Sequence, residues 1–238
     1  MATFLVAHGA WSAGWAWKKM RPVLRARGHE LFTPTHTGLG ERAHLAAPEI
    51  DLETHIADIL GVLQAEDLRK VILLGHSYGG MVATGVADRA RERIASLVYV
   101  DAFAPNDSES VFDLTPARHQ AMLETVRQSG DGWKMPPSPM PPDTPEADQA
   151  WAMPRRMPQP LKTFEQKLRF RNGDLTLPRH YIYCQRCRPD DGFRRYYERA
   201  KREGWGAYEI DASHNPHITA PEALAALLEG IAAGRAGA

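Results

Sequence analysis

Short apolar runs alternate with helix-like segments along most of this chain. Six runs are rich in Val, Ile, Leu and Tyr, which is typical of strands buried on both faces of a sheet. The segments between them have helical spacing, and several end at a glycine that favours a helix stop. The alternation predicts an α/β protein with a mostly parallel, doubly wound sheet. The expected strands are residues 3–7, 31–34, 71–74, 95–100, 180–184 and 207–210, and the expected helices are residues 15–27, 52–65, 80–90, 192–203 and 221–233.

The alternation is interrupted between residues 105 and 178. Residues 135–160 contain nine of the 18 prolines and four of the eight methionines of the chain. Because proline cannot donate to a strand ladder, we expect an insertion without regular sheet, helical around 116–128 and 161–170. Its tryptophans and methionines favour a folded cap over a disordered linker, the alternative that its composition allows. The predicted division is a core of residues 1–104 and 179–238 with a cap insertion at 105–178.

Composition narrows the class of partner. The 238 residues are 43% hydrophobic, enough for one sizeable core, and 29 Lys and Arg balance 29 Asp and Glu. This balance gives no reason to expect a nucleic acid or a membrane as partner, so we expect a small molecule. The N-terminal stretch MATFLVAHGAW lacks a basic region, and its apolar run is too short for a signal peptide or a membrane span. We therefore expect a cytoplasmic protein, and homodimerisation is left open.

The two cysteines, Cys184 and Cys187, are spaced as in some redox and metal motifs. A zinc site would need a second pair of ligands, and no suitably spaced pair occurs in the sequence. We expect two ordinary reduced thiols near a strand end. The sequence thus implies no metal and no organic cofactor.

A serine among glycines follows the third apolar run. The stretch Gly75-His-Ser77-Tyr-Gly79 fits the pattern G-x-S-x-G, which carries little weight by itself. Here, however, a strand is expected to end at Leu74 and a helix to begin after Tyr78, which is the context of a nucleophile elbow. We expect Ser77 at the tip in a strained backbone conformation, with Gly75 and Gly79 letting strand and helix approach closely.

A serine nucleophile needs a base and donors for the negative charge that develops. The loop after the last expected strand contains His214 and His217, at the sheet edge where such a base belongs. The alternative is that these histidines only cap or pack the turn. The first strand ends in His-Gly-Ala10-Trp, so we expect the backbone N–H groups of Ala10 and Tyr78 to form an oxyanion hole. The alternative, that Gly9 is only a turn residue, fits this local sequence equally well.

The stretches HGAWSAGWAW, LGHSYGGMVA and SHNPHITAP together resemble the α/β-hydrolase superfamily. The resemblance is greatest to the branch of plant methylesterases and hydroxynitrile lyases with its bacterial esterase-like relatives. It covers residues 3–104 and 179–233 and implies the α/β-hydrolase fold. In that family the catalytic histidine precedes the proline of the last helix by seven positions, as His214 precedes Pro221 here. The resemblance therefore favours His214 over His217 as the base.

The acid that would orient the base departs from the family pattern. Methylesterases place it a few residues beyond the strand that matches residues 181–184, and the aligned residue here is Cys187. Asp190 and Asp191 lie nearby, but acidic residues at a helix start are explained by capping. Asp101 closes the buried run at 96–100, and some α/β hydrolases are known to supply the acid from this strand. We favour Asp101, whose alternative role is a turn cap, and we keep Asp190 and Asp191 as candidates.

We therefore expect a serine hydrolase that cleaves a small, apolar carboxylic ester through an acyl-enzyme on Ser77, with His214 and Asp101 completing a triad. One alternative is a lyase or C–C bond hydrolase that uses the same site. Cyanohydrin chemistry is disfavoured, because the lyases carry threonine and lysine where this chain has Gly9 and Asn215. The other alternative is a small-molecule receptor without turnover. The residues expected to line the pocket are Trp11, Trp133, Met140 and Trp151. The alternative, that the residues of the cap form only its own small core, fits the sequence equally well.

Overall fold

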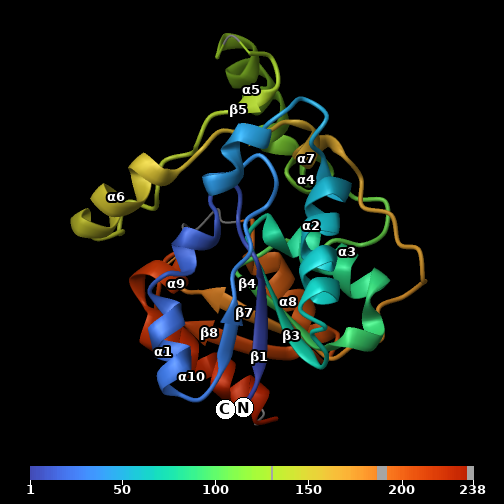
Figure 1. Cartoon of the computed structure of the whole chain (residues 1–238). Helices are drawn as coiled ribbons and strands as arrows, with labels where there is room; N and C mark the ends of the chain where they lie inside the picture. Colours follow the sequence, from blue (N-terminus) through green and yellow to red (C-terminus); the bar gives the residue numbers. More distant parts are fainter. Residues whose placement is uncertain (130, 187–191, 235–238) are drawn as a thin grey trace.

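A six-stranded, wholly parallel sheet forms the centre of the protein. The structure, a computed structural model, describes residues 1–129, 131–186 and 192–234. The strand order is β2-β1-β3-β4-β7-β8, so the predicted mostly parallel, doubly wound sheet is confirmed (Figure 1). The strands are β1 (Thr3–Ala7), β2 (Glu30–Phe32), β3 (Val71–His76), β4 (Ile94–Val100), β7 (Arg179–Cys184) and β8 (Gly206–Ile210).

Side chains from the two faces of the sheet enter two separate cores. In β1, Leu5 and Ala7 belong to one core and Phe4 and Val6 to the other, as the two-residue period of a strand requires. Helices α2, α3 and α8 cover the first face, and α1 and α10 cover the second (Figure 1). These helices are α1 (Met20–Ala26), α2 (Leu52–Ala65), α3 (Gly79–Arg89), α8 (Arg194–Arg202) and α10 (Pro221–Ala232), with short 3₁₀ helices η1 (Gly14–Trp17), η2 (Gly40–Leu45) and η3 (Arg91–Arg93) between them.

The parallel arrangement brings the ends of several strands to one edge. β3 and β4 pair in register so that His76 lies opposite Val100, and Val100 in turn lies opposite Ile182 of β7. The chain therefore leaves β3, β4, β7 and β8 at the same edge of the sheet. Loops that follow these strands meet there, which is where ligands bind in open α/β sheets.

The segment between β4 and β7 contains short elements that lie above this edge (Figure 1). The expected helix at 116–128 is present as α5, but the helix expected at 161–170 covers only α7, because Gln166 is already extended. The segment also contains one two-residue antiparallel pair, in which Lys134 lies opposite Pro160. Its elements are α4 (Val111–Leu114), α5 (Pro116–Gln128), β5 (Lys134–Met135), α6 (Glu146–Ala152), η4 (Met153–Arg155), β6 (Gln159–Pro160) and α7 (Lys162–Glu165).

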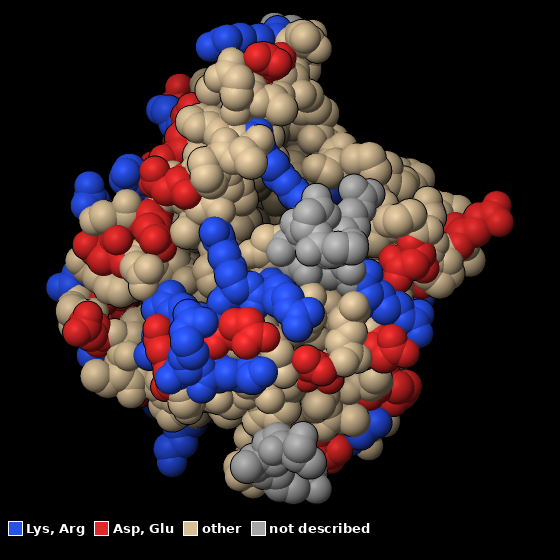
Figure 2. All heavy atoms as spheres, turned by 180° about the vertical axis from the view of Figure 1, so that it is seen from behind, with Lys and Arg blue, Asp and Glu red and all other residues tan. Residues whose placement is uncertain are grey.

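The outer surface carries charges of both signs. Figure 2 shows Lys and Arg side chains next to Asp and Glu side chains over the lower half of the rear face. This mixture agrees with the equal numbers of basic and acidic residues in the chain. In the three ranges given above, no helix combines the length and the apolar character needed to cross a membrane.

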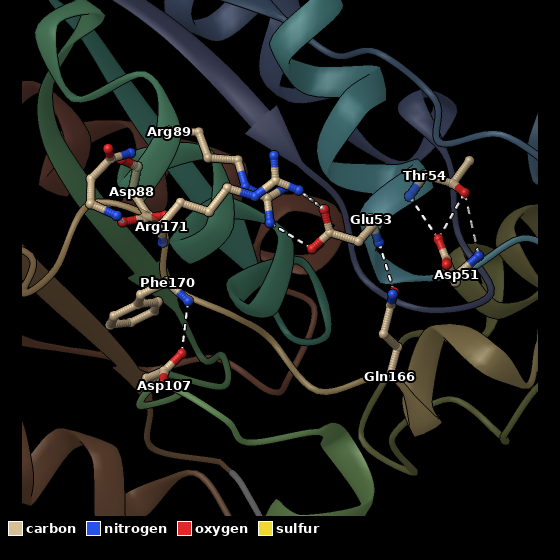
Figure 3. Close-up of polar contacts among 10 residues, drawn as sticks. Asp51, Glu53, Thr54, Asp88, Arg89, Asp107, Gln166, Phe170 and Arg171 are labelled. Atoms are coloured by element: carbon tan, nitrogen blue, oxygen red, sulfur yellow. Dashed lines mark hydrogen bonds and ion pairs between the residues drawn. The ribbon is translucent and has the colours of Figure 1, made fainter.

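Two carboxylates hold the end of the inserted segment against the core (Figure 3). Glu53 of α2 accepts hydrogen bonds from Arg89 of α3 at 2.5 Å and from Arg171 at 2.8 Å. Asp88 of α3 accepts from the backbone N–H groups of Arg171 and Asn172 at 2.8 and 3.1 Å. These bonds attach residues 171 and 172 to α2 and α3 before the chain enters β7.

Candidate active site

Ser77 occupies a sharp turn between β3 and α3. Its φ is +52°, in the left-handed region that L residues rarely adopt. Its N–H donates to the carbonyl of Val100 at 3.4 Å. A Cβ on Gly79 would lie 2.0 Å from the carbonyl oxygen of Ala7. A Cβ on Gly75 would lie 2.8 Å from the Cα of Gly80. Only glycine therefore lets the helix begin so close to β1 and β3.

His214 connects Ser77 to Asp101. Its Nε2 lies 2.9 Å from Ser77 Oγ, and its Nδ1 lies 2.7 Å from Asp101 Oδ2. Because a carboxylate only accepts, Nδ1 carries the hydrogen and donates to Asp101, which leaves Nε2 to accept from the serine hydroxyl. The structure thus brings together the three residues that the sequence suggested for a triad.

Burial differs sharply along this series. The Asp101 side chain is fully buried, whereas the His214 side chain is 28% exposed. Asp101 Oδ1 accepts a further hydrogen bond from the N–H of Cys184 at 3.3 Å, so the second oxygen of the carboxylate also has a donor. The ring of Phe193 stacks on His214 at 5.0 Å. His214 therefore faces open space on one side while a shielded carboxylate fixes the other.

His76 supports the loop that carries His214, a role that the sequence did not suggest. Its Nε2–H donates to the carbonyl oxygen of His214 at 2.7 Å. Desolvation, the main cause, together with neighbouring His217, holds the pKa of His76 well below its ordinary value, so the ring is neutral at physiological pH. The position of His76 beside the nucleophile was the only sequence signal that could have identified it.

His217, the other candidate base, makes no hydrogen bond with Ser77. It is buried, and its ring stacks on Trp17 at 4.6 Å with an interplanar angle of 13°. Burial lowers its pKa to about 3. The packing role that the sequence left open for these histidines therefore describes His217.

The loop after β1 lies against the elbow. A Cβ on Gly9 would come within 2.7 Å of His76 Nδ1 and 3.2 Å of Ser77 Cβ. The backbone N–H groups of Ala10 and Tyr78 have no acceptor within the part of the chain that the structure describes. Both residues line the same cavity as Ser77. Two backbone donors of this kind can hold a negatively charged oxygen.

Gln159 fixes the conformation of this loop, although nothing in the sequence pointed to it. Trp11 has a φ of +59°, and its N–H donates to Oε1 of the fully buried Gln159 at 3.2 Å. The Trp11 indole N–H donates to the carbonyl of Met135, and the backbone carbonyl of Trp11 accepts from the N–H of Met157. The inserted segment thus holds the residue that follows Ala10.

A cavity of about 1080 Å³ opens above Ser77 and His214. The core supplies its floor, and the segment at 105–178 supplies much of its wall. Of the four residues expected to line the pocket, Trp11 and Met140 do so. The apolar part of the wall also includes Phe103, Val111, Leu114, Met122, Phe164 and Phe193.

Trp133 and Trp151 are not on the wall of this cavity, so the expectation is not met for them. Trp151 packs edge-on against Trp15 at 5.2 Å, and Trp15 is the residue that faces the cavity. Trp133 precedes β5, where its carbonyl accepts from the N–H of Leu161. Trp151 therefore packs against the core around Trp15, and Trp133 lies at the start of the β5–β6 pair.

The remaining sequence candidates concern the cysteines and the later acids. Cys184 is buried at the end of β7, whereas Cys187, Asp190 and Asp191 lie outside the described residues. Within those residues, no group of three or more His, Cys, Asp or Glu side chains could hold a metal ion.

Three buried histidines stack behind the elbow. The ring of His36 lies 4.0 Å from that of His8 and 4.7 Å from that of His55. Burial lowers the pKa of His8 and of His55 to about 4 and that of His36 well below its usual value. His55 Nε2–H donates to the carbonyl of Thr37, so its Nδ1 accepts from the hydroxyl of Tyr78 at 2.9 Å. The neutral ring of His55, supported by the stacked His36, thus holds the side chain of Tyr78, which follows Ser77.

Chemically, this arrangement can activate a hydroxyl group. A histidine that accepts from Ser77 and is oriented by a buried carboxylate can take the serine proton as the oxygen attacks. The two free backbone donors lie in the same cavity. The site is therefore suited to acyl transfer.

Comparison with known sequences finds one family profile and several relatives. The profile of the Alpha/beta hydrolase family matches residues 4–227. The Carbendazim hydrolyzing esterase of Nocardioides sp. (strain SG-4G) is 38% identical over 248 residues, which cover 97% of this chain and 100% of that protein. Methylesterase 2 of Arabidopsis thaliana is 35% identical over 118 residues, which cover 45% of this chain and 41% of the plant protein.

Solved structures show the same fold. An extracellular alpha/beta-hydrolase from a Paenibacillus species, with structural and functional homology to tobacco Salicylic Acid Binding Protein 2, superposes with a TM-score of 0.82. The superposition covers 96% of this chain and 98% of that one at 24% identity. A likeness at this level of identity concerns the architecture and leaves the reaction open.

Proposed function

This chain belongs to the alpha/beta hydrolase family and is a hydrolase of the esterase kind, and from this premise we propose that it cleaves a small carboxylic ester through an acyl-enzyme on Ser77. The observation that carries the proposal is the hydrogen-bonded series from Ser77 through His214 to Asp101, at 2.9 and 2.7 Å. A serine hydroxyl by itself is a weak nucleophile at neutral pH, and this series supplies the base that it needs.

In the acylation half of the reaction, Ser77 Oγ forms a bond to the carbonyl carbon while its proton moves to His214 Nε2. The carbonyl oxygen becomes negatively charged and accepts hydrogen bonds from the N–H groups of Ala10 and Tyr78. His214 then gives the proton to the leaving alkoxide as the ester C–O bond breaks, which yields the alcohol. Asp101 stabilises the imidazolium that forms between these steps.

In the deacylation half, a water molecule replaces the alcohol. His214 Nε2 takes a proton from that water as its oxygen attacks the acyl carbon, and the same two N–H groups bind the second oxyanion. Collapse of the intermediate returns the proton to Ser77 Oγ and releases the carboxylic acid. The mechanism uses protein groups and water only.

The substrate is a small ester whose body is apolar. Phe103, Leu114 and Phe164 are among the apolar side chains that line the cavity, and burying apolar substrate surface against them favours binding. We propose that residues 105–178 act as the cap over this cavity. Carbendazim and methyl esters belong in the first substrate panel, because two of the relatives carry those names. We also keep the cytoplasm as the proposed location.

The experiment compares wild-type protein with Ser77→Ala. We expect the wild type to hydrolyse 4-nitrophenyl acetate and members of the panel, and a fluorophosphonate probe to label Ser77. Ser77→Ala should lower kcat on the order of 10⁴- to 10⁶-fold and abolish labelling, because triad members act as a unit. Equal turnover by both proteins would reject the serine mechanism, and ligand-induced stabilisation without turnover would favour a receptor.

A further inference from the structure

Arg156 lies in the wall of the cavity above Ser77, and its guanidinium has no polar partner among the described residues. It follows η4 and is half-buried. Its Nε is buried and makes no hydrogen bond. The rest of its guanidinium likewise makes no hydrogen bond or ion pair with any residue that the structure describes. An unpaired charge at a half-buried position costs free energy that a salt bridge would offset.

Desolvation by this burial lowers the pKa of Arg156 to about 10, so the side chain is still charged at neutral pH. Its central carbon lies 5.6 Å from the centre of the Trp11 ring, and this cation–π contact offsets part of the cost. The side chain is thus held in place by an aromatic ring, while its hydrogen-bond donors remain unused.

Each of the other arginines of the cavity is either hydrogen-bonded or exposed to solvent. Arg186 forms two hydrogen bonds with Asp211 at 2.6 and 2.8 Å. Arg195 donates to the carbonyl of Leu114 and is exposed. Arg118 is exposed as well. Arg156 is therefore the guanidinium whose donors a bound ligand would satisfy at the greatest gain.

Positive charge predominates along this wall. Four arginines line the cavity, and Asp143 is the one carboxylate among the described lining residues. Figure 2 shows a hollow in the upper half of the rear face with Lys and Arg side chains at its edge. Such a lining attracts an anionic ligand.

Arg156 lines the same cavity as Ser77 and His214. Trp11, over which it packs, directly follows Ala10, and hydrogen bonds to Gln159 and Met135 hold Trp11 in place. A group bound by the guanidinium would therefore lie in the same cavity as an ester carbonyl bound by the Ala10 N–H.

We propose that Arg156 binds a carboxylate carried by the substrate, so that the preferred ester has an apolar body and one anionic end. A guanidinium presents two parallel N–H donors that match the two oxygens of a carboxylate. This inference rests on the proposed esterase function, and it adds the class of substrate to it.

The test uses two pairs of esters that differ only in the carboxylate. Monomethyl adipate is compared with methyl hexanoate, and 4-acetoxybutyrate with butyl acetate, so that the anionic end lies once on the acyl side and once on the alcohol side. In at least one pair, the wild type should prefer the anionic ester by about tenfold or more in kcat/KM. Arg156→Gln should reduce that preference by about 10- to 100-fold, as expected for hydrogen bonds between charged groups.

Two variants serve as controls. Arg156→Lys keeps the charge but loses the planar fork, and should retain an intermediate preference. Arg155→Gln changes the neighbouring arginine, which is exposed, is not on the cavity wall and donates to the carbonyl of Trp151. It should leave the preference unchanged. The inference is overturned if the wild type prefers neither anionic ester, or if Arg156→Gln slows both members of each pair equally.

A binding measurement separates this inference from the proposed function. Calorimetry of monomethyl adipate and 4-acetoxybutyrate with the Ser77→Ala protein requires no turnover. We expect at least one of them to bind the Ser77→Ala protein more tightly than a Ser77→Ala/Arg156→Gln protein. The ratio of the two dissociation constants should be similar to the loss of preference in kcat/KM. If no ester is hydrolysed but this difference is found, only the esterase proposal fails. If binding is absent or equal, the carboxylate site is rejected.

Discussion

Nδ1 of His214 lies 2.7 Å from Oδ2 of Asp101, although 113 residues separate the two in the sequence. Asp101 directly follows β4 and has a φ of +43°, so the chain turns sharply at the sheet edge. The N–H of Cys184, at the end of neighbouring β7, donates to the other carboxylate oxygen. Asp101 is thus held by two adjacent strands beside Ser77.

Asp101→Asn should fold normally and be nearly inactive. The amide would present a donor or a weaker acceptor to His214 and favour the wrong tautomer, which costs on the order of 10⁴-fold in kcat. The measurement is kcat, with the melting temperature as a check on folding. The control changes Asp190 and Asp191 together to Asn and should stay active. An active Asp101→Asn protein with an inactive double variant would assign the acid to the later loop.

The two histidines of the last loop should differ in function. His214→Ala should lower kcat about as much as Ser77→Ala, because the base and the nucleophile act together. His217→Ala should cost stability, since His217 stacks on Trp17, while changing kcat far less. Steady-state kinetics and thermal melts of both variants decide this. The opposite order of kcat values would identify His217 as the base.

His76 should act as a positioning residue for His214. Replacing it with Leu removes the N–H that donates to the His214 carbonyl, and we expect kcat to fall by about tenfold with little change in KM. His76→Gln can supply an N–H near the same place and should recover part of this loss. If both variants lose the same activity together with thermal stability, His76 only packs the core.

Alanine variants of Met140 and Trp151 compare a residue on the cavity wall with a residue that packs behind it. Met140→Ala enlarges the cavity and should shift the preference among straight-chain 4-nitrophenyl esters toward longer acyl chains, on the order of tenfold in the kcat/KM ratio. Trp151→Ala removes packing behind Trp15 and should cost about 2 kcal/mol of stability with the preference unchanged. A constant preference in the Met140 variant would mean that the acyl chain binds elsewhere.

The buried neutral histidines should make folding sensitive to acid. Their pKa values in the folded protein lie below 6.5, at about 4 for His8 and His55 and about 3 for His217. Between these values and 6.5 the unfolded chain binds more protons, so stability should be constant above pH 6.5 and fall as the pH drops toward 4. Urea unfolding from pH 7.5 to 4.5 measures this slope.

A variant pair tests the origin of that slope. His217→Phe keeps a ring against Trp17 and removes one titrating group, so the decline should be shallower. His44→Gln changes an exposed histidine of η2 and should leave the slope unchanged. Equal slopes in all three proteins would mean that His217 contributes nothing to the acid sensitivity.

The strands and most helices could be predicted because their signals are local. The apolar run of β3 and the glycines around Ser77 lie within ten residues of one another, and each pattern allows few backbone conformations. The boundaries of β1 and α2 agree with the sequence prediction to the residue. The same locality identified Ser77 and the loop of His214, since a turn or a loop after a strand is visible in sequence.

The cavity wall was decided by tertiary structure. Between residues 105 and 178 the chain has many prolines and few periodic runs, so its path depends on distant contacts such as that of Gln159 with Trp11. Composition could name large side chains there, but it could not tell Met140, which faces the cavity, from Trp151, which lies behind Trp15. Nor could it single out Arg156, because whether a guanidinium is paired depends on which distant groups the fold brings within hydrogen-bond reach.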